Sequence, residues 1–181
     1  GDWSSDVCSS DLGNMMEILN VRVDDRLVHG VVATNWIPRL NVARVIVIDK
    51  ESANNPMLKS VLRMATPKNV NLSVITAEKT LDNFRAQRYG NEKIMIVVKT
   101  LEPILELIEG GFHIDKLILG NLGNQQKTDS TTVLTRYVSV DESTIPQLKK
   151  IADSGVQVVA QLIPEDSEEP VIELMKKKGL I

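Results

Sequence analysis

Residues 43–49 read ARVIVID, in which four consecutive β-branched apolar side chains precede a closing aspartate. An unbroken apolar run of this length is typical of a strand that is covered on both faces. Residues 93–99 (KIMIVVK) repeat the pattern, with an apolar run between two lysines. These two stretches therefore predict strands of a sheet that is buried between two layers of helices.

The rest of the chain from residue 16 alternates between strand and helix patterns. Further strands are predicted at residues 17–23, 70–75, 116–119, 133–140 and 156–163. Helices, with apolar residues three and four positions apart, are predicted at residues 27–36, 56–65, 76–87, 100–108, 141–152 and 168–178. Helices between strands indicate βαβ units. The prediction is one α/β domain with an open, mainly parallel β-sheet and helices on both faces.

Four residues are expected to set helix ends. Asn55, Thr100 and Asp141 precede predicted helices, and their side chains are of the types that accept a hydrogen bond from a first-turn backbone N–H. Pro38 follows the first predicted helix. We expect it to end that helix, because proline has no N–H to donate.

The first fourteen residues, GDWSSDVCSSDLGN, have no apolar period and no signal-peptide pattern. Their string DWSSDVCSSDL resembles the in-frame translation of a sequencing-library adapter, so we interpret residues 1–14 as a non-native tail. A disordered native tail is the alternative. The domain is then expected at residues 15–181, and Cys8 lies outside it.

Composition excludes several classes of protein. The chain has 181 residues, with 21 basic and 24 acidic side chains and a formal charge of −3, which gives no support for nucleic-acid binding. A single cysteine excludes an internal disulfide framework and a cysteine-based zinc site. The apolar runs are far shorter than the roughly 20 residues of a membrane-spanning helix, so a cytoplasmic protein is expected.

The loop after the first predicted strand carries a concentrated set of reactive side chains. Residues 24–30 read DDRLVHG, which places two carboxylates, a guanidinium and an imidazole at a strand-to-helix turn. Ligands gather at such strand ends in parallel sheets. His29 is one of only two histidines in the chain. In a purely structural interpretation, Asp25 caps the helix and His29 fills its first turn, and local chemistry alone does not decide between this and a functional interpretation.

An imidazole in this loop could be a general base, a metal ligand or a nucleophile that accepts phosphate. As an acceptor, His29 would be helped by Arg26, which can clamp phosphate through two parallel hydrogen bonds. Asp24 or Asp25 could orient the ring. A metal site is less favoured, because neither a second histidine nor a further carboxylate lies at ligand spacing nearby.

Backbone amides are expected to complete such a phosphoryl-binding site. Those of Leu27, Val28 and Gly30 lie at the positive N-terminus of the predicted helix. The absence of a side chain at Gly30 would also let a partner approach the ring closely.

A second loop, residues 120–129, follows a predicted strand and is rich in glycine and asparagine. The amides around Gly120 and Gly123 could cradle a phosphoryl group, and Lys127 could add a positive charge. The alternative is that these glycines serve turn geometry, because the full spacing of a P-loop or a dinucleotide fingerprint is absent.

The run Arg22-Val23-Asp24-Asp25-Arg26-Leu27-Val28-His29-Gly30 resembles the active-site motif of a family of bacterial transport proteins. These are the enzyme IIB components of the mannose/fructose/sorbose family of the sugar phosphotransferase system (PTS). The resemblance covers residues 16–163, with supporting stretches at residues 62–67 (LRMATP) and 138–141 (VSVD). The fold of that family agrees with the one predicted from the strand and helix patterns.

The resemblance implies that His29 is a phosphohistidine. It would take the phosphoryl group from a phosphorylated IIA protein and pass it to a sugar that crosses the membrane through IIC and IID subunits. Arg26 would bind the phosphoryl group, while Asp25 and Asp24 would hold the loop and orient the histidine. The activity would be that of a protein-N-phosphohistidine–sugar phosphotransferase without a cofactor, held at the inner face of the membrane by IIC and IID.

This chain departs from the family pattern at two places. Val31 stands after the His-Gly pair, where family members usually carry a polar residue, and residues 120–127 replace a Gly-Gly-Met run that is followed by basic residues. These departures bear on the sugar and on the choice of partner. The sequence leaves both open, together with the oligomeric state, a homodimer included.

Two other classes of function compete with this interpretation. In a receiver-like signalling module, Asp24 and Asp25 would bind Mg²⁺ and Asp49, at the end of the second predicted strand, would accept phosphate. A non-catalytic α/β binding module that uses the same strand-end crevice is the third class.

Overall fold

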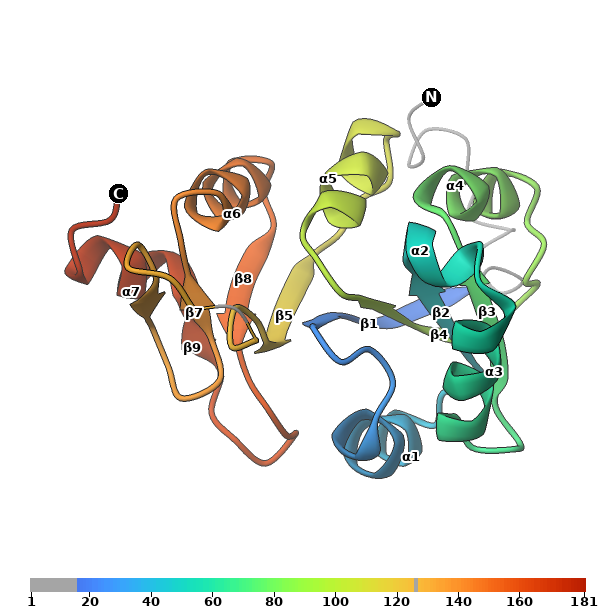
Figure 1. The fold of residues 1–181 in the computed structure, drawn as a ribbon. Coiled ribbons are helices and arrows are strands. Elements are labelled where there is room, and N and C mark those ends of the chain that lie inside the picture. The colour runs from blue at the N-terminus through green and yellow to red at the C-terminus, as the bar shows by residue number, and fades with distance from the viewer. Residues whose placement is uncertain (1–15, 126) are drawn as a thin grey trace.

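The computed structural model describes residues 16–125 and 127–181, which fold around a seven-stranded sheet with the strand order β3-β2-β4-β1-β5-β8-β9 (Figure 1). The neighbours pair in parallel, apart from β8 and β9, which are antiparallel. The strands are β1 (Glu17–Asp24), β2 (Arg44–Ile48), β3 (Asn71–Ile75), β4 (Lys93–Val98), β5 (Lys116–Asn121), β8 (Gln157–Ala160) and β9 (Glu169–Pro170). The predicted mainly parallel α/β fold is thereby confirmed.

Helices cover both faces of this sheet. They are η2 (Val32–Trp36, a π-helical turn), α1 (Ile37–Leu40), α2 (Lys50–Ala53), α3 (Pro56–Ala65), α4 (Ala77–Arg85), α5 (Glu102–Glu109), α6 (Thr144–Asp153) and α7 (Val171–Lys177). Residues of α4, α5, α6 and α7 belong to one apolar cluster, and residues of η2, α1 and α3 belong to the other. In Figure 1, α4, α5 and α6 lie along one side of the sheet, and α1 and α3 lie on the opposite side.

The unbroken apolar strands supply both clusters. Ile46 and Ile48 of β2 pack on the side of α4 and α5, whereas Val45 and Val47 pack on the side of α1 and α3. All four side chains are at most 1% exposed. Successive side chains of a strand point to opposite faces, so a strand between two helical layers needs apolar residues at every position.

The predicted strand at residues 133–140 is wrong. This segment forms two short antiparallel strands, β6 (Thr132–Val133) and β7 (Ser139–Val140), which make a separate sheet. The carbonyl of Val138 accepts the backbone N–H groups of Leu134 and Thr135, so the chain reverses between them. The apolar alternation that predicted one strand therefore comes from the two arms of a hairpin.

The helix starts follow the predictions in part. Asn55 caps α3, because its Oδ1 accepts the N–H groups of Met57 and Leu58. Oδ1 of Asp141 accepts the N–H groups of Ser143 and Thr144 just before α6 begins. Thr100 was wrongly expected to cap the next helix, since α5 begins at Glu102 after Leu101 and has no side-chain cap.

Two helix ends also differ from expectation. Pro38 lies inside α1, and the helical backbone continues to Leu40. The π-helical turn just before it is wider than an α-turn, and we attribute the tolerance of proline to that irregular hydrogen bonding. At the other end of the chain, the predicted helix at residues 168–178 begins only at Val171, because Glu169 and Pro170 pair with β8 as the edge strand β9.

Candidate active site

Two loops meet at the carboxyl ends of the central parallel strands β1 and β5, whose connections run towards opposite edges of the sheet. From β1 the chain continues to β2, towards the β3 edge of the sheet, and from β5 it continues to β8, towards the β9 edge. The backbone N–H of Asp25 donates to the carbonyl of Asn121 at 2.9 Å, so the two strand ends stay in contact. Ligands of open α/β sheets bind at such switch points.

His29 is held by a buried carboxylate. Its Nε2 lies 2.8 Å from Oδ2 of Asp24, whose side chain is 0% exposed, whereas the His29 side chain is 17% exposed. Oδ1 of Asp24 accepts the backbone N–H of Arg26 at 3.1 Å. An ionised carboxylate only accepts hydrogen bonds, so Nε2 carries a proton and the lone pair of the neutral ring lies on Nδ1.

Arg22, for which the sequence predicted no role of its own, supports Asp24 from inside the fold. Its Nε lies 3.7 Å from Oδ2 of Asp24, and both side chains are fully buried. Nη1 and Nη2 donate to the carbonyls of Gln161 at 3.0 Å and Leu162 at 2.8 Å. The guanidinium also lies 5.0 Å from the ring centre of Trp36. Burial lowers the pKa of Arg22 to about 10, opposed by the charge of Asp24, so the guanidinium stays charged at neutral pH.

Gly120 lies in β5 beside this guanidinium. A Cβ at position 120 would come within 2.0 Å of Nη2 of Arg22. Glycine leaves room for the buried arginine here, and any other residue would require the guanidinium or the backbone to shift. The structure thus gives Gly120 a packing role, and its predicted part in phosphoryl binding stays a prediction.

Asp25 carries an unpaired carboxylate. Both of its oxygens are inaccessible to solvent and have no hydrogen-bond partner among the described residues, so Asp25 does not cap the helix. Burial raises the pKa of Asp25, and the charge of Asp24 adds to the rise. Three groups oppose this rise in pKa: the nearby backbone amide of Asn124 and the charges of Arg26 and His29. The amide of Asn124 is close to Asp25 but does not have the geometry of a hydrogen bond.

A strained turn at Leu27 directs His29 back towards the strand end. Leu27 has a φ of 57°, in the left-handed region that residues other than glycine rarely adopt. Its N–H donates to the carbonyl of Asp24 at 2.9 Å, so this amide is already engaged. The side chains of Leu27 and Val28 are buried in the apolar cluster that contains residues of α1 and α3. Packing of these two side chains holds the turn in its unfavourable conformation.

Several groups of the first loop that were predicted to bind a phosphoryl group have no partner among the described residues. The Arg26 side chain is exposed and forms no hydrogen bond or ion pair with the described residues. The backbone amides of Val28 and Gly30 likewise have no acceptor within the described ranges, and the helical backbone begins at Gly30. A Cβ at Gly30 would meet nothing within 4 Å. These groups therefore lie at a helix N-terminus where an anion can approach.

The second loop is tied to the hairpin of β6 and β7, and none of its described residues forms a hydrogen bond or ion pair with the His29 side chain. Gly123 has a φ of 76°, and a Cβ there would lie 2.3 Å from the carbonyl oxygen of Ser139, so turn geometry and packing both require glycine. Nδ2 of Asn124 donates to Oδ1 of Asn121 and to the carbonyl of Tyr137. Lys127 is exposed. The predicted roles of Gly123 and Lys127 in phosphoryl binding stay predictions.

The three aspartates of the receiver-like alternative do not come together. Asp49 follows β2, which is separated from β1 by β4, so the two strand ends are roughly 10 Å apart in the sheet. Oδ2 of Asp49 accepts the N–H and the hydroxyl of Ser52 and caps α2. Asp24 is occupied by His29 and Arg22.

Metal binding and membrane insertion are two other properties on which the described residues bear. Within residues 16–125 and 127–181, no group of three or more His, Cys, Asp or Glu side chains is arranged to hold a metal ion. In the same ranges, no helix is long and apolar enough to cross a membrane.

Comparison with known proteins gives a consistent set of relatives. Residues 18–181 match the family model described as PTS system sorbose subfamily IIB component. The PTS system fructose-specific EIIB component of Bacillus subtilis is 29% identical over 162 residues, which cover 90% of this chain and 98% of that protein. The mannose-specific EIIAB component of Escherichia coli is 30% identical over 156 residues, which cover 86% of this chain and 47% of that longer protein. The IIB domain of the sorbose permease from Klebsiella pneumoniae superposes with a TM-score of 0.81 at 24% identity, covering 90% of this chain and 98% of that domain.

Proposed function

Because this chain belongs to the sorbose subfamily of IIB components of the sugar phosphotransferase system, we propose that it carries a phosphoryl group on His29. It accepts this group from a phosphorylated IIA protein and passes it to a sugar that enters through membrane IIC and IID subunits. It therefore acts as a phosphotransferase at the inner face of the membrane, with residues 15–181 as the working domain.

The contact between His29 and Asp24 is the observation that carries this proposal. Nε2 is engaged by a fully buried carboxylate at 2.8 Å, which leaves Nδ1 as the nitrogen with a free lone pair. Nδ1 is therefore the phosphoryl acceptor. When Nδ1 forms its bond to phosphorus, the ring becomes positively charged, and the negative charge of Asp24 stabilises it.

The transfer needs no water and no net proton change at the acceptor. The Nδ1 lone pair attacks the phosphorus atom while the bond from phosphorus to the donor nitrogen breaks, and the donor keeps that electron pair. Arg26, whose side chain is exposed and unpaired among the described residues, neutralises the phosphoryl oxygens. The amides of Val28 and Gly30 at the helix start, which have no acceptor among the described residues, add hydrogen bonds to these oxygens.

In the second half of the reaction a sugar hydroxyl attacks the phosphorus atom and the bond to Nδ1 breaks. Nδ1 keeps the electron pair of that bond, the hydroxyl proton passes to solvent water as the sugar phosphate forms, and His29 returns to its neutral state with Nε2 on Asp24. The space beside Gly30 is open, which allows the acceptor to approach the ring.

The direct test uses a phosphorylated IIA partner with a radiolabelled phosphoryl group. We expect His29→Ala to accept no label, whereas His113→Ala serves as the matched control and accepts it at the wild-type rate. The label on the wild-type protein should survive base and be lost in acid, as a phosphohistidine is. Labelling of His29→Ala would overturn the proposal, and so would a label that base or hydroxylamine removes.

A further inference from the structure

Trp36, the last residue of the π-helical turn η2, is buried beside the arginine that supports the candidate active site. Only 4% of its surface is exposed. Its indole N–H donates to the carbonyl oxygen of Leu162 at 2.8 Å, and the same oxygen accepts Nη2 of Arg22, also at 2.8 Å. The Arg22 guanidinium lies 5.0 Å from the centre of the Trp36 ring. The two side chains are therefore held together at one backbone oxygen.

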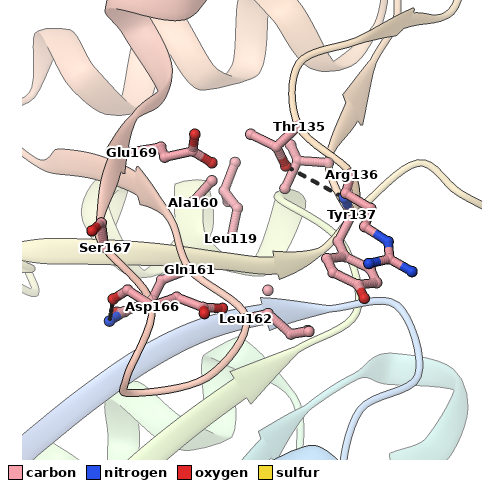
Figure 2. Close-up of a pocket in the computed structure, with 12 residues that line it drawn as sticks. Leu119, Thr135, Arg136, Tyr137, Ala160, Gln161, Leu162, Asp166, Ser167 and Glu169 are labelled. Carbon is pink, nitrogen blue, oxygen red and sulfur yellow. Dashed lines mark hydrogen bonds between the residues drawn. The ribbon is translucent and has the colours of Figure 1, made fainter.

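The segment that supplies this oxygen comes from the far side of β5. Gln161 and Leu162 follow β8, and their segment forms one wall of the pocket shown in Figure 2. β5 lies between β8 and β1 in the sheet, so the segment reaches Arg22 of β1 across β5. Gly120 of β5 leaves the room for this contact. The guanidinium is thus enclosed by the backbone of β5, the segment after β8 and the ring of Trp36.

The helical segment between His29 and Trp36 closes a ring of contacts. The N–H of Ala33 donates to the carbonyl of His29 at 2.9 Å, so helical hydrogen bonding begins at His29. The imidazole contacts Asp24, Asp24 faces Arg22, and Arg22 lies against Trp36. Because this segment is tied to β1 at both ends, a shift of Trp36 would change the place of His29 relative to Asp24.

Arg22 needs these contacts, because its own contact with Asp24 is long. Its Nε is buried, lies 3.7 Å from Oδ2 of Asp24 and has no hydrogen-bond partner among the described residues. An aromatic face attracts a guanidinium, tryptophan most strongly and more so where water is excluded. Without the indole, a cavity would open beside the guanidinium and the carbonyl of Leu162 would lose one of its donors. Arg22 could then turn away from Asp24.

A tryptophan in an apolar cluster can also serve packing alone. Trp36 belongs to the cluster that contains residues of η2, α1 and α3. A buried indole N–H needs an acceptor, but packing does not require one that is shared with Arg22. Packing alone predicts only a loss of stability when Trp36 is replaced, whereas a positioning role also predicts a change at the imidazole of His29.

We propose that Trp36 is a positioning residue for His29 and acts through Arg22 and Asp24. This role rests on the function proposed above for His29. The indole fixes Arg22, Arg22 fixes Asp24, and Asp24 keeps the proton of the neutral imidazole on Nε2. Nδ1 then keeps its lone pair for the phosphoryl group.

The first measurement needs no partner protein. Long-range ¹H–¹⁵N spectra of the ¹⁵N-labelled full chain at alkaline pH report which imidazole nitrogen carries the proton. Wild type should show Nε2–H at His29, and Trp36→Leu should show a mixture with the Nδ1–H form. Trp36→Phe keeps a ring but loses the N–H, so its spectrum should lie between the two. Phe84→Leu, which removes a buried aromatic ring from the opposite apolar cluster, should keep the wild-type form.

The second measurement is single-turnover transfer from a IIA partner that carries a radiolabelled phosphoryl group. At saturating donor, the rate for Trp36→Leu should fall about tenfold or more, since a small displacement of the acceptor is costly. The half-saturating donor concentration should stay within about twofold of wild type, and Trp36→Phe should recover part of the rate. Phe84→Leu should transfer within about twofold of wild type, although thermal unfolding should show a loss of stability.

The proposal is overturned if Trp36→Leu keeps the wild-type imidazole form and rate, or if Phe84→Leu changes both as much as Trp36→Leu does. If Trp36→Leu does not fold, Trp36→Phe decides by the same two measurements. A wild-type protein that accepts no label on His29 would contradict the proposed function, whereas a changed imidazole form in Trp36→Leu would still support the positioning role.

Discussion

The chain contains two histidine–aspartate pairs of nearly equal length in very different surroundings. His29 Nε2 lies 2.8 Å from Asp24 Oδ2, and His113 Nε2 lies 2.7 Å from Asp115 Oδ1. The first pair lies at the carboxyl end of β1, where Asp24 is the last strand residue, and the second pair precedes the amino end of β5. Asp24 is 0% exposed and Asp115 is 91% exposed.

The difference teaches that the contact distance alone does not define a site. Water screens the exposed pair and competes for hydrogen bonds with both His113 and Asp115, so this pair contributes little to stability. Asp24 is fixed by Arg22 and by the backbone N–H of Arg26, and it can hold His29 in one orientation and one tautomer. Parallel substitutions at the two pairs therefore measure how much burial of the aspartate contributes to the function of the histidine.

The largest expected effect comes from replacing each aspartate by asparagine. Asp24→Asn removes the negative charge that fixes Nε2–H and stabilises the charged ring, so phosphoryl acceptance by His29 should fall about 100-fold or more. Asp115→Asn should leave the rate within twofold. Initial rates of label transfer from the IIA partner provide the measurement, with circular dichroism to confirm folding. Equal losses in the two variants would remove the distinction between the pairs.

A smaller effect is expected from displacing Arg22, which supports Asp24, while His29 and Asp24 themselves stay unchanged. In Gly120→Ala the new Cβ would meet the Arg22 guanidinium at 2.0–2.5 Å, so the arginine must move away from Asp24 or the strands must separate. Overpacking of this kind costs about 1–3 kcal/mol, measured by chemical denaturation. Gly30→Ala, where a Cβ meets nothing within 4 Å, is the control for stability and should lose none. A Gly120→Ala protein as stable as wild type would show that Arg22 is not tightly held.

The smallest effect is a pH dependence of stability at Asp25. Burial raises the pKa of this carboxyl in the folded protein above its ordinary value of 3.8. Between those two pKa values the folded state binds more protons than the unfolded state, so the free energy of unfolding falls as pH rises through this window. This loss of free energy of unfolding, which comes from burying the ionised carboxylate, is fully present above the raised pKa and is absent below 3.8.

Asp25→Asn removes this penalty, so the variant should gain stability relative to wild type as pH rises through the window and keep that gain at neutral pH. Denaturation curves from acidic to neutral pH measure the difference. Asp115→Asn, at the exposed pair, provides the comparison. A difference between Asp25→Asn and wild type that stays constant with pH would contradict the buried state of this carboxylate.

Sequence reasoning found the elements whose pattern is local. The buried strands were predictable because a strand between two helical layers needs apolar side chains at every position, as in residues 43–49 and 93–99. The loop at residues 24–30 was found because its charged residues are adjacent in the sequence. The hairpin at residues 132–140 was missed, because two arms of a hairpin and one alternating strand have the same apolar period.

The support of the candidate site was not predictable in the same way. Arg22 stands between Val21 and Val23 in a buried strand, and an arginine at such a position is itself a signal, since charges are rarely buried without partners. Its partners, however, are the carbonyls of Gln161 and Leu162, which are 139 and 140 residues away in the chain.

The amino-acid sequence by itself determined the parallel α/β fold and the place of His29 after the first strand, because periodicity and strand-end loops are local properties. Only the tertiary structure decided that Asp24 rather than Asp25 holds the imidazole, and that Gly120 makes room for Arg22. The physical reason is that burial and hydrogen-bond partners depend on which strands become neighbours. That order, with β1 between β4 and β5, is set by packing of the whole sheet.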